Sequence, residues 1–205
     1  MHFSLALALV LLASGCMCSG GDNAPKGLVL AANRDCKSLE NTLERDACYK
    51  LSSISSNDSG QCAKISQEGE RWVCYRFVAL RLRNPDVCSR IGESFDRDRC
   101  LFDVAFKANK SSVCGKIGDT QVKIFCNAIF KADASYCKGM EPQDDASFCQ
   151  AIVKRDSSYC DKIADSTQKS MCYASLASMT GDDRICEKIG DSPSKEGCAN
   201  LAKGI

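Results

Sequence analysis

The stretch CGKIGDTQVKIFC, residues 114–126, contains two cysteines twelve positions apart and an apolar residue three positions after the first of them. The same cysteine spacing occurs seven times along the chain. The interval from one pair to the next is 14 residues, or 11 in two places, so the repeat is 26 or 23 residues long. A period of this kind predicts an array of structural repeats. The pairs are Cys36 with Cys48, Cys62 with Cys74, Cys88 with Cys100, Cys114 with Cys126, Cys137 with Cys149, Cys160 with Cys172, and Cys186 with Cys198.

Within each repeat the residue pattern predicts two helices joined by a turn. The apolar residue three positions after the first cysteine, such as Ile117 or Ile163, marks the buried side of a short first helix. Five repeats have Asp or Asn four positions before that cysteine, where a helix N-cap is expected. After the turn, Ser or Thr, as in Thr120 and Ser192, is expected to cap the second helix, and Pro193 suits a first helical position. The sequence therefore predicts an all-α solenoid of seven short helical hairpins.

The disulfide pairing is expected to lie within each repeat. The two cysteines flank the turn nearly symmetrically, and an antiparallel hairpin brings such positions side by side at the Cα separation that a disulfide needs. The alternative pairing joins the second helix to the next repeat, but its spacing varies by three residues, as between Cys126 and Cys137. A bond with fixed geometry favours the fixed spacing. Each staple would also offset the small core of a 23–26-residue hairpin.

The N-terminus indicates export. Residues 3–13 are apolar and uncharged, too short to span a bilayer, and small residues follow, so residues 1–15 are predicted to be a signal peptide. Leu12-Ala13-Ser14-Gly15-Cys16 resembles the lipobox of prokaryotic lipoproteins. That resemblance implies cleavage before Cys16 and attachment of a lipid to its sulfur. The density of cysteine, 16 in 205 residues, agrees with an oxidising compartment. Simple secretion after signal cleavage is the alternative.

Three segments follow from this division. Residues 1–15 are the signal peptide, the small and polar residues 16–27 form a tether, and residues 28–205 form the repeat domain. Residues 28–32 have the character of the end of a second helix, half a repeat before the first hairpin. The plan resembles the stacked helix pairs of tetratricopeptide and cysteine-rich Sel1-like proteins. That resemblance implies a curved surface that binds proteins or peptides.

The composition argues against several chemistries. The only histidine, His2, leaves with the signal peptide, and Cys-x-x-Cys and Gly-rich phosphate-binding motifs are absent. We therefore predict no catalytic residues, no metal and no cofactor. Net charge is +1, which does not suggest a nucleic-acid partner. A hydrolase that uses paired carboxylates stays open as a less favoured alternative.

Basic residues form the most visible surface pattern, nine positions after the first cysteine in six repeats, and they are a possible binding surface for an anionic polymer or lipid headgroup. The favoured interpretation is local, because acids such as Asp165 and Asp191 lie four residues before their bases. The fifth repeat lacks these bases and has an acidic turn at residues 141–145, for which loop variation is the favoured interpretation and a contact site is the alternative. The six basic residues are Arg45, Arg71, Arg97, Lys123, Lys169 and Lys195.

The functional expectation is a membrane-anchored lipoprotein of the cell envelope that faces the extracytoplasmic side. It would act as a binding or scaffold protein, with another protein or an envelope polymer as its partner. A secreted soluble binder or inhibitor with the same repeats is the alternative. Cys18 is left over by this scheme, and its role, like the oligomeric state, does not follow from the sequence.

Overall fold

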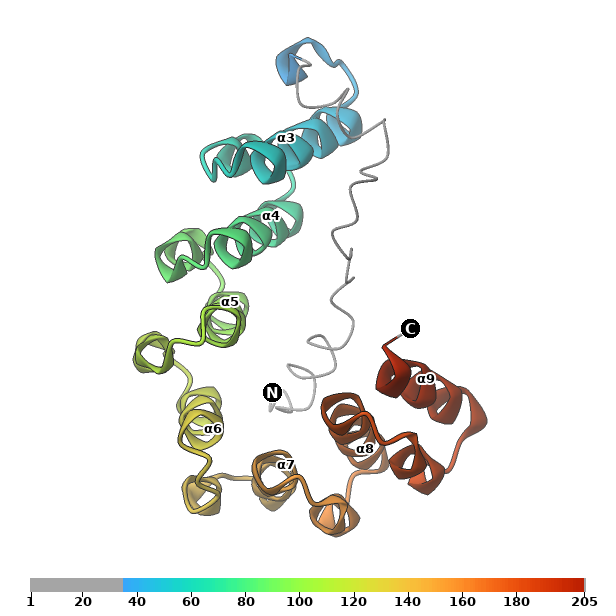
Figure 1. The fold of residues 1–205 in the computed structure, drawn as a ribbon. Coiled ribbons are helices and arrows are strands. Elements are labelled where there is room, and N and C mark those ends of the chain that lie inside the picture. The colour runs from blue at the N-terminus through green and yellow to red at the C-terminus, as the bar shows by residue number, and fades with distance from the viewer. Residues whose placement is uncertain (1–34, 205) are drawn as a thin grey trace. The chain divides into compact units, whose positions relative to one another are not determined.

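The computed structural model describes residues 35–204, and every regular element in this range is helical (Figure 1). The predicted all-α repeat fold is confirmed. The predicted signal peptide, the lipobox-like cysteine, the tether and residues 28–34 lie outside the described residues.

Each repeat has a short helix that carries the first cysteine and a longer α-helix that carries the second. The short helices are 3₁₀-helices, a type that the sequence did not predict: η1 (Cys36–Ser38), η2 (Gln61–Lys64), η3 (Pro85–Arg90), η4 (Ser111–Lys116), η5 (Tyr136–Gly139), η6 (Ser157–Lys162) and η7 (Asp183–Lys188). The α-helices are α3 (Thr42–Ser56), α4 (Glu68–Leu82), α5 (Ser94–Lys107), α6 (Thr120–Lys131), α7 (Gln143–Lys154), α8 (Ser166–Thr180) and α9 (Ser192–Lys203).

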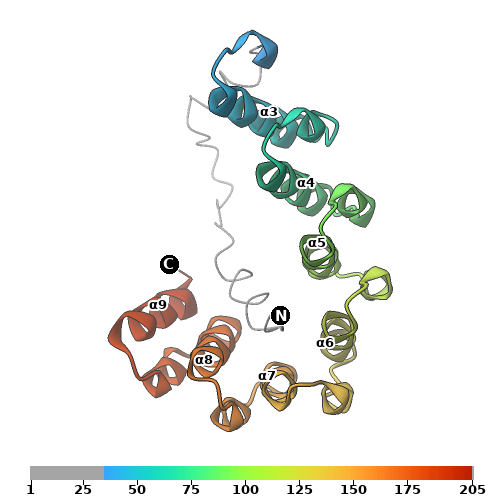
Figure 2. The same ribbon diagram turned by 180° about the vertical axis from the view of Figure 1, so that it is seen from behind.

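The described chain forms two compact units, residues 35–118 and residues 119–204. In the first unit α3, α4 and α5 lie side by side in chain order, and the 3₁₀-helices lie along their other side (Figures 1 and 2). In the second unit α6 to α9 follow one another in the same way, with each α-helix packed on the next. Each unit thus stacks the helices of successive repeats, and the fourth repeat is divided, with η4 in the first unit and α6 in the second.

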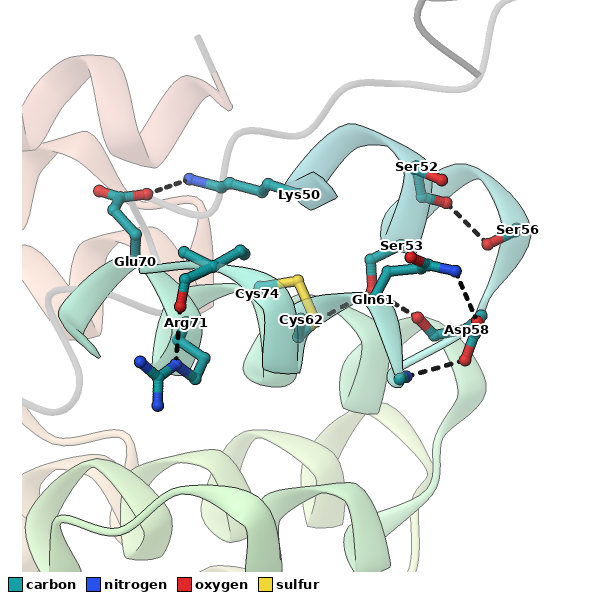
Figure 3. Close-up of a disulfide and its surroundings, with 12 residues drawn as sticks. Lys50, Ser52, Ser53, Ser56, Asp58, Gln61, Cys62, Glu70, Arg71 and Cys74 are labelled. Atoms are coloured by element: carbon teal, nitrogen blue, oxygen red, sulfur yellow. Dashed lines mark hydrogen bonds and ion pairs between the residues drawn. A yellow bond between two sulfur atoms is a disulfide. The ribbon is translucent and has the colours of Figure 1, made fainter. Parts of the chain in front are cut away.

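The disulfides pair within the repeats, as predicted. Cys114 and Cys126 are disulfide-bonded, and six further bonds join cysteines twelve positions apart with Cα–Cα distances of 5.6–5.7 Å. These are the distances that unstrained disulfides prefer. Figure 3 shows the bond that ties η2 to α4. The six bonds join Cys36 to Cys48, Cys62 to Cys74, Cys88 to Cys100, Cys137 to Cys149, Cys160 to Cys172 and Cys186 to Cys198.

The disulfides lie inside the core, and every cysteine of the seven pairs is buried, Cys48, Cys149 and Cys172 among them. The predicted apolar residue three positions after the first cysteine is buried in six repeats, while its counterpart Leu39 in the first repeat is half-buried. Small buried residues such as Ala79 let neighbouring elements approach closely. The six buried apolar residues are Ile65, Ile91, Ile117, Met140, Ile163 and Ile189.

The end of each α-helix turns the chain sharply into the next 3₁₀-helix. Arg83, which follows α4, has a positive φ of 51°, and the next N–H, that of Asn84, donates back to Ala79 O at 3.0 Å. The side chain of Asn84 then accepts from the N–H of Asp86 at 3.0 Å. This combines a left-handed helix end with a capped helix start. The predicted Asp or Asn is the N-cap in three repeats, where Asn84, Asp156 and Asp182 cap η3, η6 and η7. Asp58 and Asp133 instead accept from Gly60 N and Ser135 N in the turns before η2 and η5, whose N-caps are Gly60 and Ser135.

The predicted cap of the α-helix was wrong by one residue. Thr42, Ser166 and their equivalents are the first helical residues, and the cap is the residue before them. Asn41 accepts from the N–H groups of Leu43 and Glu44, and Asp165 accepts from that of Gln168. A carboxylate is a strong acceptor for these N–H groups. Because α9 begins at Ser192, Pro193 is its second residue and not its first.

Candidate binding surface

Three of the six basic residues nine positions after the first cysteine bind the turn of their own repeat. Arg71 donates from Nε to Ile65 O at 2.9 Å and from Nη2 to Ser66 O at 3.2 Å (Figure 3). Arg45 and Arg97 bind the corresponding turns of their own repeats. Arg45 donates to Leu39 O at 3.3 Å, and Arg97 donates to Gly92 O at 3.4 Å.

The lysines at this position fit the local interpretation less uniformly. Lys195 pairs with Glu187 at 2.6 Å, and not with Asp191, the acid four residues before it. Asp191 is instead the cap of α9. Lys123 and Lys169 occupy the equivalent position on α6 and α8 and are half-buried. The three arginines therefore stabilise the turns of their own repeats. An acid four residues before a base, such as Asp191, caps the helix and does not pair with that base.

Three of the five basic residues two positions after the first cysteine lie over aromatic rings of the preceding repeat. Lys64 lies 5.4 Å from the ring centroid of Tyr49, and Lys188 lies 5.5 Å from that of Tyr173. Arg90 stands over Tyr75 in the same way. The three tyrosines directly follow the second cysteine of their repeats and are buried. A cation over an aromatic face is attractive, so these contacts hold neighbouring repeats together.

Carboxylates of one α-helix hold the turn of the next repeat. Asp46 accepts from the backbone N–H groups of Ser66 and Gln67, at 2.9 and 3.2 Å. Asp98 accepts from Gly118 N at 2.9 Å. Both residues lie two positions before the second cysteine and twenty before their first partner. This role was not predicted, although Asp at that position was visible in two repeats of the sequence.

The acidic turn of the fifth repeat has the same role. Asp144 accepts from Ala164 N and Asp165 N, at 2.9 and 3.0 Å, and Asp145 accepts from the Gln168 side chain at 2.6 Å. The interpretation as loop variation was therefore wrong. Asp144 lies three positions earlier in α7 than Asp46 does in α3. The interval from the second cysteine to the next repeat is also three residues shorter after α7 than after α3. Three residues are about one helical turn, so the carboxylate stays on the same face.

A buried ion pair joins α4 to α5. Arg76 contacts Oδ2 of Asp103 from Nε at 2.6 Å and from Nη2 at 2.5 Å. Asp103 is buried, and this burial raises the pKa of its carboxyl group although Arg76 opposes the shift. Arg99 lies close to both groups, and burial lowers the pKa of its guanidinium. No sequence pattern indicated this cluster, because neither residue of the ion pair repeats at its position.

Residues 35–204 contain no group of three or more acidic, histidine or cysteine residues arranged to hold a metal ion. Among the helices of this described range, none has the length and apolar character needed to cross a membrane.

Several exposed apolar side chains lie on one face of the first unit. Leu43 of α3 is 65% exposed, Phe77 of α4 is 51% exposed and Val73 is 37% exposed. Four positions of each α-helix share one helical face: five and one before the second cysteine, and three and seven after it. We call this face on the three helices the α3–α5 ridge. Its residues are Leu43, Ala47, Leu51 and Ser55 of α3, Gly69, Val73, Phe77 and Arg81 of α4, and Phe95, Arg99, Asp103 and Lys107 of α5.

The second unit buries large apolar residues at some of the same positions. Phe125 and Phe148, each one position before the second cysteine, are fully buried, and their ring centroids lie 6.2 Å apart. Ile152, three positions after the second cysteine of α7, is buried as well. Apolar residues one position before or three after the second cysteine can therefore be buried or exposed in this repeat, while Met179, seven positions after Cys172, is exposed in the second unit.

No protein-family model matches this chain, and no significant similarity to a curated protein or a solved structure is found. A functional proposal therefore rests on the residues of the chain itself.

Proposed function

We propose that this chain is an exported binding or scaffold lipoprotein, held at a membrane of the cell envelope by a lipid on Cys16. It would present its helical repeats to a protein or an envelope polymer on the extracytoplasmic side. The observation that carries the proposal is the set of seven regularly spaced disulfides, which indicates an oxidising compartment. The lipobox-like residues 12–16 supply the anchor in this proposal.

Binding is favoured over catalysis because the buried carboxylates already have structural partners. Asp46 holds two backbone N–H groups, Asp103 pairs with Arg76, and Asp145 accepts from Gln168. A hydrolytic pair needs carboxylates that face a substrate. A secreted soluble binder is the alternative, and it differs from the proposed function only in the anchor.

The anchor is tested by comparing two single cysteine variants. The wild-type chain and the control Cys18→Ser should fractionate with membranes, and mass spectrometry should find a diacylglyceryl group on residue 16. Cys16→Ser should be released or should keep its signal peptide. If wild-type protein is soluble and carries no lipid, the anchored form is wrong and the secreted binder takes its place.

A further inference from the structure

We propose that the α3–α5 ridge binds a peptide segment that combines apolar and acidic side chains. This inference rests on the binding role proposed above and assigns it a surface and a class of partner. The partner segment would belong to another protein in the same compartment.

The apolar part of the argument is the exposure of large side chains in register. Leu43, Val73 and Phe77 lie on the same face of adjacent helices, and Phe95 continues the row on α5 at 36% exposure. A contiguous apolar surface is rare on a soluble protein unless something covers it. Because the second unit buries Phe125, Phe148 and Ile152, which lie one position before or three after the second cysteine, the repeat itself does not require this exposure.

The charged part of the argument is that the accessible charges of the ridge are all basic. Arg81 and Lys107 are exposed and make no ion pair or hydrogen bond with the described residues. The one acidic residue at a ridge position, Asp103, is buried and paired with Arg76. An apolar surface with basic charges complements a ligand that is apolar and acidic.

Arg99 adds a more specific requirement. Its Nε is buried and has no hydrogen-bond partner among residues 35–204, and the same is true of Oδ1 of the neighbouring Asp103. A buried donor without an acceptor is unfavourable, and a guanidinium matches a carboxylate especially well. An acidic side chain of the ligand would supply that acceptor between α4 and α5.

The size of the ridge favours a peptide. Neighbouring helices pack about 8–10 Å apart, so three helices present a row roughly 20 Å long. An extended peptide of about six residues, or a helix of about thirteen, spans that length. A lipid bilayer would also meet apolar and basic groups, but it offers no carboxylate held at a fixed point for Arg99.

The test is selection from a random library of 16-residue displayed peptides on the disulfide-bonded chain with Cys16→Ser. Enriched peptides should combine apolar residues with Asp or Glu. Phe77→Ser and Arg81→Glu should each weaken their binding about 10-fold or more. The controls Met179→Ser and Arg155→Glu change exposed residues of the second unit and should leave binding unchanged. Circular dichroism should show that all four variants fold.

The proposal is overturned if no peptide is enriched, if enriched peptides are basic, or if the ridge variants bind them as wild type does. It is also overturned if only vesicles of phosphatidylglycerol and phosphatidylcholine bind, with loss in the same two variants. Because the tested chain has no lipid, these outcomes are independent of the anchor. Failure of the anchor with success of the peptides would leave the ridge intact in a soluble binder.

Discussion

At the scale of single residues, aspartate joins the repeats by accepting backbone N–H groups. Burial alone would raise the pKa of Asp46, but the N–H groups of Ser66 and Gln67 outweigh that effect, and its pKa lies below the ordinary value. The ionised carboxylate therefore stabilises the turn that begins the next repeat. Asp98 and Asp144 act on equivalent turns, so the role follows from position in the stack and not from one local motif.

The contribution of this carboxylate can be measured with Asp46→Ala. The variant leaves two backbone N–H groups in a partly buried turn without their acceptor, so we expect unfolding to become easier by about 1–2 kcal/mol at neutral pH. Glu44→Ala, an exposed residue of the same helix, is the control and should change stability by less than about 0.5 kcal/mol. Urea denaturation followed by circular dichroism makes the comparison. Equal effects in the two variants would contradict this role for Asp46.

At the scale of elements, the joints between repeats combine a left-handed residue with a capped 3₁₀-helix. Gly181 occupies the left-handed position after α8, but Asn57, Arg83, Ala132 and Arg155 occupy it elsewhere with φ of 51–57°. Side chains other than glycine adopt this conformation at a cost. The chain thus keeps the tight turn even where the residue at the left-handed position disfavours it. The hydrogen bonds before and after that residue fix the geometry of the turn.

Ala132→Gly should therefore stabilise the protein, by about 1 kcal/mol, since glycine adopts φ of 51° without steric cost. Ala47→Gly is the matched control, because Ala47 is exposed within α3, and glycine there should destabilise by about 1 kcal/mol. Opposite signs of the change in the urea midpoint would support the left-handed joint. Loss of stability in both variants would contradict it.

At the scale of the whole molecule, stability comes from staples and from contacts between neighbours. Each hairpin is too small to bury a core alone, and each disulfide closes a short loop that contributes up to about 3 kcal/mol. The inter-repeat contacts, including the carboxylate bridges and the cations over Tyr49 and Tyr173, join only adjacent repeats. An array of this kind is approximately a sum of repeat and interface terms.

Position in the array should then decide how much a disulfide matters. Replacing Cys88 and Cys100 with serine removes a staple that has neighbours on both sides, whereas replacing Cys186 and Cys198 removes one at the end of the described chain. We expect the first double variant to unfold at the lower urea concentration, because two interfaces are weakened instead of one. Equal midpoints would mean that the repeats do not stabilise one another.

The capping carboxylates make stability depend on acid. The pKa of Asp156 is lowered mainly by the backbone N–H of Ser158, and that of Asp182 mainly by the side chain of Arg184. A lowered pKa stabilises the fold at pH above 3.8, the ordinary value, and this stability is lost as the pH falls below it.

The urea midpoint should therefore change little between pH 7 and pH 5 through these groups and fall near pH 3. The double variant Asp156→Asn, Asp182→Asn keeps capping side chains that do not titrate, so its midpoint should fall less at low pH. A drop at pH 3 as large as that of wild type would show that these two caps do not cause the acid dependence.

The sequence by itself determined the repeat, its helical hairpins and the pairing of cysteines within it. These features depend on separations of twelve residues or fewer, where chain geometry fixes which side chains meet. The burial of Ile117 and the capping role of Asn84 were predictable for the same reason. The helix type and the exact cap of the second helix were not, because a shift of one residue changes neither the spacing nor the apolar face.

Only the tertiary structure decided what happens between repeats. Asp46 and Ser66 lie twenty positions apart, and Arg76 and Asp103 lie twenty-seven apart. Whether such residues meet depends on how neighbouring helices are rotated and spaced, which no local pattern specifies. The same holds for the α3–α5 ridge: Phe77 is exposed while Ile152, at the equivalent position, is buried, because burial is set by the packing of adjacent helices and not by the residue's place in the repeat.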